Sequence, residues 1–204
     1  MIRNVIFDLG NVLLSWKPGE YLENNGYDPA TIERIMVEIF RSPEWLALDN
    51  GDLSLHDAIE RIQKKSSFKT DEIYAVFNLR TKILAPIGPN TKIIPELKKE
   101  GYRLFYLSNF PADIFDEVRS NHAFFGFFDG GLISANARAS KPDPKIFNLL
   151  FEKYSIDPSE SLFIDDTHVN AVSAETLGVS VIHLSDPLTL VEKLEEILGL
   201  RFLS

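Results

Sequence analysis

The sequence predicts an α/β protein built on a doubly wound, mostly parallel sheet, with an α-helical domain inserted into it. Two observations lead to this prediction. Short apolar runs alternate with segments of helical periodicity over most of the 204 residues, as expected for a parallel sheet that helices cover on both faces. Between the first two runs lie roughly seventy residues with helical periodicity only, far more than one crossover connection needs.

Five runs of apolar, β-branched or aromatic residues account for the predicted sheet. Their alternation with helices is typical of a Rossmann-like fold, in which ligands bind outside the carboxyl ends of the strands. Polar residues that directly follow these runs are therefore the first candidates for a functional site. We expect strands at Val5–Leu9, Arg103–Leu107, Gly131–Ile133, Ser161–Ile164 and Val179–His183.

Three helices of the sheet-bearing part carry recognisable boundaries. Thr91–Glu100 has helical periodicity, and Pro95 is expected to distort its first turn. Pro144–Tyr154 follows Asp143, a candidate N-cap, with proline at the first helical position. The pair Asp186–Pro187 repeats that arrangement before a final helix, whose apolar face is Leu190, Val191, Leu194, Ile197 and Leu198.

The segment after the first strand contains several amphipathic patterns and is predicted to be a helical cap domain. The apolar residues fall at helical spacing, as in Ile32, Ile35, Met36, Ile39 and Phe40. Linkers are expected near Ser15–Gly19 and Ala85–Pro89. The predicted division is a core domain of residues 1–15 and 87–204 and a cap domain of residues 16–86. Such a cap can close over the strand ends and exclude water.

Composition limits the classes of partner. The net charge of −9 argues against nucleic acid or an anionic membrane as the main partner, since both favour a basic surface. The absence of cysteine excludes disulfides, zinc–thiolate sites and thiol nucleophiles. The sequence shows neither a leader pattern nor an apolar run of about 20 residues. We expect a cytoplasmic protein, monomeric or homodimeric.

Two of the predicted strand ends carry polar residues suited to phosphate chemistry. Asp8 directly follows the run Val5–Phe7, and a carboxylate at a strand end suggests a nucleophile. Ser108 and Asn109 follow the second run, where a hydroxyl and nearby backbone amides could hold phosphate oxygens. For Ser108 the alternative is an N-cap of a helix that begins near Pro111.

Two further segments add a cation and a pair of acids. Lys141 lies in a proline-flanked stretch before the helix at Pro144, where its ammonium could neutralise a nucleophile and a phosphate. A lone lysine is otherwise an ordinary surface residue. Asp165 and Asp166 end a buried run, and their mutual repulsion calls for a compensating cation such as Mg²⁺. The alternative is that one of them caps the next helix.

Taken together, these four segments resemble the four motifs of the haloacid dehalogenase superfamily, in order and over the whole chain. The first motif, Asp-x-Asp-x-Thr/Val, is matched by Asp8 and Val12, whereas Gly10 replaces the second aspartate. The inserted helices stand where many members carry a cap. The closest resemblance is to the α-D-glucose-1-phosphate phosphatase group, and the phosphatase domain of soluble epoxide hydrolase is a more distant one.

The resemblance implies a Mg²⁺-dependent phosphatase that hydrolyses a small phosphorylated metabolite, with sugar phosphates among the candidates, through an aspartyl-phosphate on Asp8. The implied metal ligands are Asp8, the Gly10 carbonyl, Asp166 directly, and Asp165 directly or through water. Ser108, Asn109 and Lys141 would bind the phosphate, and Lys141 would also link it to Asp8.

Gly10 leaves the reaction without the family's usual acid and base, which could cost about 10²–10⁴ in rate. A good leaving group, a residue of the cap or His168 could compensate. Haloacid dehalogenases and phosphonatases also lack the second aspartate, the latter using a cap lysine, for which Lys64 and Lys65 are candidates. A third hypothesis, beside a phosphatase and a dehalogenase or phosphonatase, is a phosphate-binding protein with weak or no activity. Substrate contacts are sought among the cap aromatic residues Trp16, Tyr21, Phe40 and Trp45.

Overall fold

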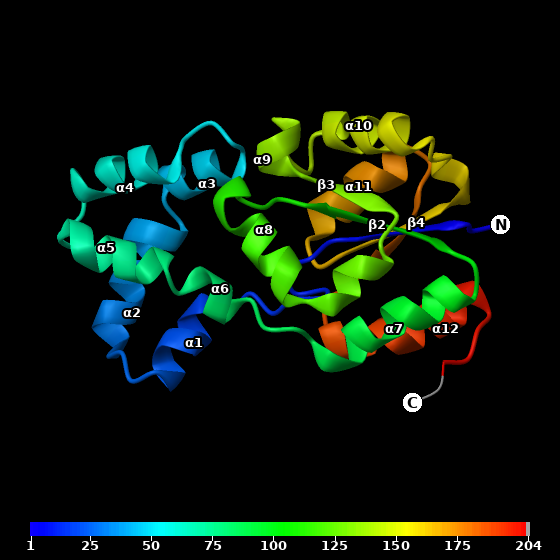
Figure 1. Ribbon diagram of the computed structural model, residues 1–204, viewed down its shortest axis with the longest axis horizontal. Coiled ribbons are helices and arrows are strands. Elements are labelled where there is room, and N and C mark those ends of the chain that lie inside the picture. Colours follow the sequence, from blue (N-terminus) through cyan, green and yellow to red (C-terminus); the bar gives the residue numbers. More distant parts are fainter. Residues whose placement is uncertain (203–204) are drawn as a thin grey trace.

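A five-stranded, entirely parallel sheet with helices on both faces forms the larger part of the computed structural model, which describes residues 1–202 (Figure 1). The strand order is β3-β2-β1-β4-β5. All neighbouring strands are parallel, so their carboxyl ends lie at the same end of the sheet, as the Rossmann-like prediction requires. The strands are β1 (Asn4–Phe7), β2 (Arg103–Ser108), β3 (Gly130–Ile133), β4 (Ser161–Asp165) and β5 (Ser180–His183).

The alternation of side chains along β1 accounts for the two layers of helices. Val5 and Phe7 face one apolar cluster, which includes residues of α7 (Gly88–Lys99), α8 (Ala112–Asn121) and α12 (Leu190–Leu198). Ile6 points to the other cluster, with α10 (Pro144–Tyr154) and α11 (His168–Thr176). Because β1 is buried on both faces, it is apolar throughout except for Asn4.

A separate group of helices lies beyond one end of the sheet (Figure 1). It has an apolar cluster of its own, in which Trp45, Ile59 and Phe77 are buried. Two adjacent chain segments join it to the sheet, with the Ser15 amide donating to the Ala85 carbonyl at 2.7 Å. The predicted division into domains remains a prediction. The helices are α1 (Pro18–Asn24), α2 (Pro29–Ile35), a π-helical turn (Met36–Phe40), α3 (Pro43–Asp49), α4 (Leu55–Gln63), α5 (Thr70–Phe77) and α6 (Arg80–Ile83).

Short elements complete the structure. They are α9 (Ser134–Ala137) and 3₁₀ turns at Ala123–Phe127, Pro158–Glu160 and Pro187–Thr189. The last of these corrects part of an expectation. Asp186 caps the segment as predicted, accepting from the Leu188 amide at 2.9 Å, but Pro187 opens a 3₁₀ turn and α12 begins only at Leu190. No helix within residues 1–202 combines the length and the apolar character that crossing a membrane would need.

Two other boundaries differ from the expected ones. Strand β1 stops at Phe7 because the chain then turns, with the Leu13 amide donating to the Leu9 carbonyl at 2.9 Å. Helix α7 begins at Gly88, so Pro95 lies in its middle and removes the amide that would bond to the Thr91 carbonyl. The predicted N-cap at Asp143 is confirmed, since its side chain accepts from the Lys145 amide at 2.8 Å.

Gly131 marks a close approach between β3 and β2. It lies directly opposite Tyr106, and a Cβ atom added there would stand 2.4 Å from the Tyr106 ring. We expect Gly131→Ala to lower the free energy of unfolding by about 1–3 kcal/mol through overpacking, measured by urea denaturation. Gly19→Ala is the control, because nothing lies within 4 Å of its added Cβ. Equal stability of the two variants would contradict the expectation.

Candidate active site

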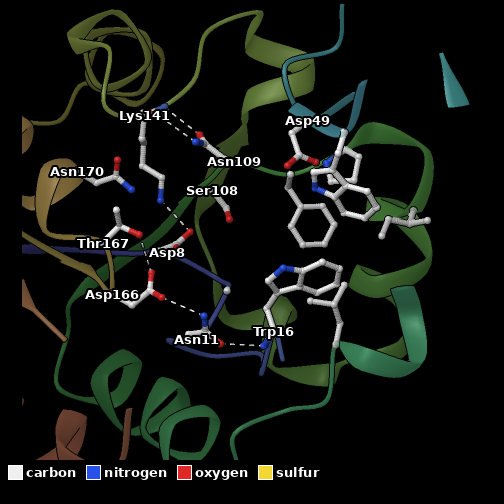
Figure 2. Close-up of a pocket in the computed structure, with 16 residues that line it drawn as sticks. Asp8, Asn11, Trp16, Asp49, Ser108, Asn109, Lys141, Asp166, Thr167 and Asn170 are labelled. Atoms are coloured by element: carbon white, nitrogen blue, oxygen red, sulfur yellow. Dashed lines mark hydrogen bonds and ion pairs between the residues drawn. The ribbon is translucent and has the colours of Figure 1, made fainter. Parts of the chain in front are cut away.

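A pocket opens where the carboxyl ends of β1, β2 and β4 face the separate group of helices (Figure 2). The register explains this meeting, because Phe7 pairs with both Tyr106 and Ile164, which places Asp8, Ser108 and Asp165 at one edge of the sheet. The polar side of the pocket is lined by Asp8, Gly10, Asn11, Ser108, Asn109, Lys141, Asp166, Thr167 and Asn170.

The centre of the polar side is a buried lysine between two carboxylates. Lys141 Nζ lies 2.8 Å from Asp8 Oδ1 and 2.6 Å from Asp165 Oδ2, and the Lys141 side chain is 1% exposed. Burial alone would lower the pKa of Lys141, but Asp8 and Asp165 outweigh it and raise that pKa above its usual value. The lysine is therefore a fixed positive charge within the protein and not a surface residue.

Asn109 holds the backbone of Lys141 in place. Its Oδ1 accepts from the Lys141 amide and its Nδ2 donates to the Lys141 carbonyl, both at 2.9 Å. Because both polar atoms of the side chain are used in this way, the contacts indicate a positioning role for Asn109. Its expected contact with phosphate remains a prediction.

The two adjacent aspartates have different surroundings. Asp165 is fully buried and accepts hydrogen bonds from the Thr167 amide at 2.8 Å and from Asn170 Nδ2 at 3.1 and 3.2 Å. Asp166 is half-buried, lines the pocket and accepts from Asn11 Nδ2 at 3.0 Å. The Thr167 hydroxyl also donates to Asp166 Oδ1, at 3.2 Å. Both aspartates therefore have protein donors, but Asp166 lines the pocket whereas Asp165 is fully buried.

Three carboxylates share this site with one ammonium. Asp8, Asp165 and Asp166 each offer an oxygen, and these oxygens lie within 4.8 Å of one another. Burial raises the pKa of Asp8 and Asp165 adds to the rise, while Lys141 and the Ser108 hydroxyl oppose it. Asp8 Oδ1 is buried and makes no hydrogen bond among the described residues, although it is ion-paired to Lys141. Such an excess of negative oxygen ligands suits a divalent metal.

Ser108 and Gly10 also lie at the pocket as expected. Ser108 is buried and faces Asp8, and its alternative role as an N-cap is wrong, since α8 begins at Ala112 with Pro111 before it. Gly10 lines the pocket, and a Cβ added to it would approach nothing closer than Trp16 Cβ, at 4.0 Å. The position therefore has room for a side chain that the sequence does not supply.

Asn11 is a site residue that the sequence interpretation missed. It adopts a left-handed backbone conformation with φ of 52°, and its side chain connects Asp166 to the Trp16 amide, which donates to Oδ1 at 2.9 Å. Asparagine enters this backbone region more readily than most residues. The Gly10–Asn11 pair directly after the predicted strand Val5–Leu9 is the sequence signal that could have revealed this turn.

The opposite side of the pocket is largely apolar. It includes Trp16, which stacks on Trp45 with ring centroids 5.6 Å apart. Of the aromatic residues considered as substrate contacts, these two line the pocket, whereas Phe40 packs against both rings and Tyr21 packs against the helical cluster. The remaining apolar lining residues are Leu84, Phe110, Pro111 and Ile114.

Asp49, at the end of α3, is the second residue that the sequence interpretation missed. It lines the apolar side of the pocket (Figure 2). Burial raises its pKa to about 7, although a hydrogen bond from the Trp45 side chain and the charge of Arg80 lower it. A single aspartate at a helix end has no distinguishing local pattern, so the sequence offered no signal for it.

Three residues considered as alternative contributors do not line the pocket. His168 is exposed on α11, with its ring centroid 5.2 Å from that of His183. Lys64 is exposed, and Lys65 is paired with Glu44 on the surface of the helical group. None of the three is among the residues that line the pocket.

Comparisons with known proteins identify a family and several relatives. A family model described as haloacid dehalogenase-like hydrolase matches residues 2–178. A sesquiterpene phosphatase of Aspergillus oryzae is 28% identical over 197 residues, which cover 97% of each chain. Mouse acyl-CoA dehydrogenase family member 10 is 28% identical over 210 residues, which cover 97% of this chain but 19% of that protein.

Solved structures share the fold. A HAD-like family hydrolase from Porphyromonas gingivalis superposes with a TM-score of 0.76 at 24% identity, covering 98% of this chain and 100% of that one. A HAD family enzyme from Bacteroides thetaiotaomicron, in complex with magnesium and inorganic phosphate, gives a TM-score of 0.70 at 24% identity, covering 89% and 93%.

Proposed function

The chain belongs to the haloacid dehalogenase-like hydrolases, and from that premise we propose that it is a Mg²⁺-dependent phosphatase that cleaves a small phosphate monoester through an aspartyl-phosphate on Asp8. The observation that carries the proposal is the cluster at the strand ends, where Lys141 lies between Asp8 and Asp165, with Asp166 lining the pocket beside them. The phosphatase among the relatives supports the same reaction class.

The metal proposal depends on charge and ligand chemistry. Mg²⁺ prefers oxygen ligands, and the three close carboxylates carry more negative charge than Lys141 can balance. We propose that Asp8, Asp166 and the Gly10 carbonyl hold the ion and that Asp165 supports it indirectly, since Lys141, Thr167 and Asn170 occupy its oxygens. When bound, Mg²⁺ would offset the repulsion between the nucleophile and the phosphate.

Each remaining residue has a role that its contacts support. Asp8 is the proposed nucleophile, since it lines the pocket and its carboxylate is held by the ion pair with Lys141 at 2.8 Å. Lys141 balances the charge of Asp8 and of the phosphate, and the Ser108 hydroxyl faces the same space. Asn109 keeps Lys141 in position through its backbone.

The other two reaction classes have less support. A phosphonatase would need a lysine of the helical group in the pocket, but Lys64 and Lys65 do not line it. A haloacid dehalogenase needs no metal, so it would leave the excess charge of the acidic cluster unexplained. A weak or inactive protein would be revealed by the activity measurement below.

The apolar side of the pocket suggests how the organic part of the substrate is bound. Stacked Trp16 and Trp45 present ring faces that can pack against the C–H face of a sugar or against a hydrocarbon chain. Sugar phosphates are therefore candidates, as are phosphorylated apolar alcohols of the kind implied by the Aspergillus relative.

Removal of Mg²⁺ is expected to lower the rate of phosphate release at least about 10²-fold, because the charge on the nucleophile and phosphate would then be uncompensated. The measurement is a screen of sugar, nucleotide, terpenyl and aryl phosphates with Mg²⁺ and with EDTA, followed by re-addition of Mg²⁺. Halide release from 2-haloacids without metal, and no phosphate release from any ester, would overturn the proposed function.

A further inference from the structure

The pocket contains one ionisable side chain that the proposed reaction does not yet use. Within the described residues, the titratable groups that line it are Asp8, Asp49, Lys141 and Asp166. Three of them already have proposed roles: Asp8 is the nucleophile, Asp166 a metal ligand, and Lys141 binds the phosphate. Gly10 provides no carboxyl group, and His168 lies outside the pocket, so Asp49 is the proton donor left to consider.

The backbone of Asp49 is fixed against the sheet-bearing part of the molecule. Its carbonyl accepts a hydrogen bond from the buried Ser134 hydroxyl, which in turn accepts from the Phe110 amide at 2.9 Å. Gly51 packs so closely on Ala135 that an added Cβ would lie 2.4 Å from its carbonyl oxygen. These contacts hold the end of α3 beside the strand ends.

The side chain of Asp49 faces the cavity from the side opposite Asp8 (Figure 2). Its Oδ1 is buried and has no hydrogen-bond partner among residues 1–202. In an in-line displacement the leaving oxygen departs on the side of phosphorus away from the nucleophile. A substrate attacked by Asp8 would therefore direct its leaving oxygen towards the side of the pocket that carries Asp49.

We propose that Asp49 is the general acid that protonates the leaving-group oxygen, in place of the carboxyl group absent at Gly10. This inference rests on the proposed phosphatase function. The Asp8 oxygen bonds to phosphorus as the bond to the leaving oxygen breaks, and that oxygen takes the bond's electron pair and the Asp49 proton. Water then attacks phosphorus, the bond to Asp8 breaks and returns its electron pair to Asp8, and a proton of the water restores Asp49.

The charges around Asp49 suit this role. Arg80 on α6 and Asp113 on α8 are the ionised groups that face it, and they form a two-point ion pair with each other at 2.6 and 3.1 Å. Their opposite charges largely cancel, and burial raises the pKa of Asp49 to about 7. A general acid is most effective when its pKa lies near the working pH.

The test compares leaving groups. We expect Asp49→Asn to lower kcat/KM about 10²-fold or more for an alkyl phosphate, whose alkoxide needs a proton, but less than about 5-fold for p-nitrophenyl phosphate. Asp52→Asn is the matched control, since Asp52 is exposed and does not line the pocket. An equal loss on both esters, or no loss on the alkyl ester, would overturn the role of Asp49. Absence of activity in the unmodified chain would instead contradict the proposed function.

Two further measurements separate an acid from a structural residue. For the alkyl ester, kcat/KM should fall as the pH rises through about 7, because the proton donor is lost, and Asp49→Asn should lack this fall. Gly10→Asp, for which the structure has room, should restore alkyl ester hydrolysis in the Asp49→Asn background and add little by itself. Strong acceleration by Gly10→Asp alone would show that the unmodified chain has no acid, against the proposal.

Thermal melts give a readout independent of activity. The folded-state pKa of Asp49 lies above the value of an unfolded aspartate, so its protonation favours folding at low pH, and that contribution is lost as the pH rises to about 7. The melting temperature of Asp49→Asn relative to the unmodified chain should therefore rise from pH 4 to pH 8. The same difference at both pH values would contradict a buried acid at this position.

Discussion

Replacing Asp8 with asparagine is expected to abolish phosphate release while leaving the fold intact. The amide cannot attack phosphorus, so kcat should fall at least about 10⁴-fold. The shapes of the two side chains match, and Lys141 keeps its ion pair with Asp165 at 2.6 Å. The variant should therefore melt as a folded protein. The measurements are phosphate release and a thermal melt, each made beside the Asp52→Asn control.

Trapping the intermediate makes the Asp8 experiment sharper. Acid quenching during turnover of a ³²P-labelled ester should leave label on the unmodified chain and none on Asp8→Asn. Label on the variant, or activity above about 1% of the unmodified chain, would assign the nucleophile to another residue. Magnesium binding, followed by calorimetry, should weaken in the variant but persist, because Asp166 remains open to the pocket.

The residues at the strand ends could be predicted because their positions follow from local sequence. An apolar run that ends in Asp8, Ser108 or Asp165 sets both the strand and the polar residue after it, and parallel pairing brings the ends together. The same reasoning predicted the doubly wound sheet, which the structure and its neighbours confirm. The strand and helix boundaries found to differ include the start of α7, which begins at Gly88 and not at the expected Thr91.

Residues defined by tertiary contacts could not be predicted in this way. The partner of Asn109 lies 32 residues away at Lys141, and no local pattern distinguishes a positioning amide from one that binds phosphate. Burial raises the pKa of Asp49, and its neighbours Trp45, Arg80 and Asp113, which come from α3, α6 and α8, modify that pKa. Such an environment exists only after the helical group has packed against the sheet.

Replacing Lys141 with methionine is expected to damage both activity and stability. The ammonium is the charge that neutralises buried Asp8 and Asp165, at 2.8 and 2.6 Å. Removing one member of a buried ionic cluster typically costs about 3–5 kcal/mol, because the charges left behind have lost water as well as their partner. We expect a loss of this order in urea denaturation at pH 7, and a fall in kcat/KM of at least about 10³-fold.

Comparison with two other variants assigns this loss to the charge. Lys145→Met removes an exposed lysine from α10 and should change neither quantity appreciably. Lys141→Arg keeps the charge but places a larger, planar guanidinium where the compact ammonium fits. It should therefore recover part of the stability and little of the activity. Saturating Mg²⁺ should narrow the stability gap between Lys141→Met and the unmodified chain, because a cation beside Asp8 offsets some of the uncompensated charge. Suppose instead that Lys141→Met and Lys141→Arg had the same free energy of unfolding, and that Mg²⁺ changed neither. Charge balance would then not stabilise the cluster of Asp8, Asp165 and Lys141, and the metal proposal would lose its physical basis.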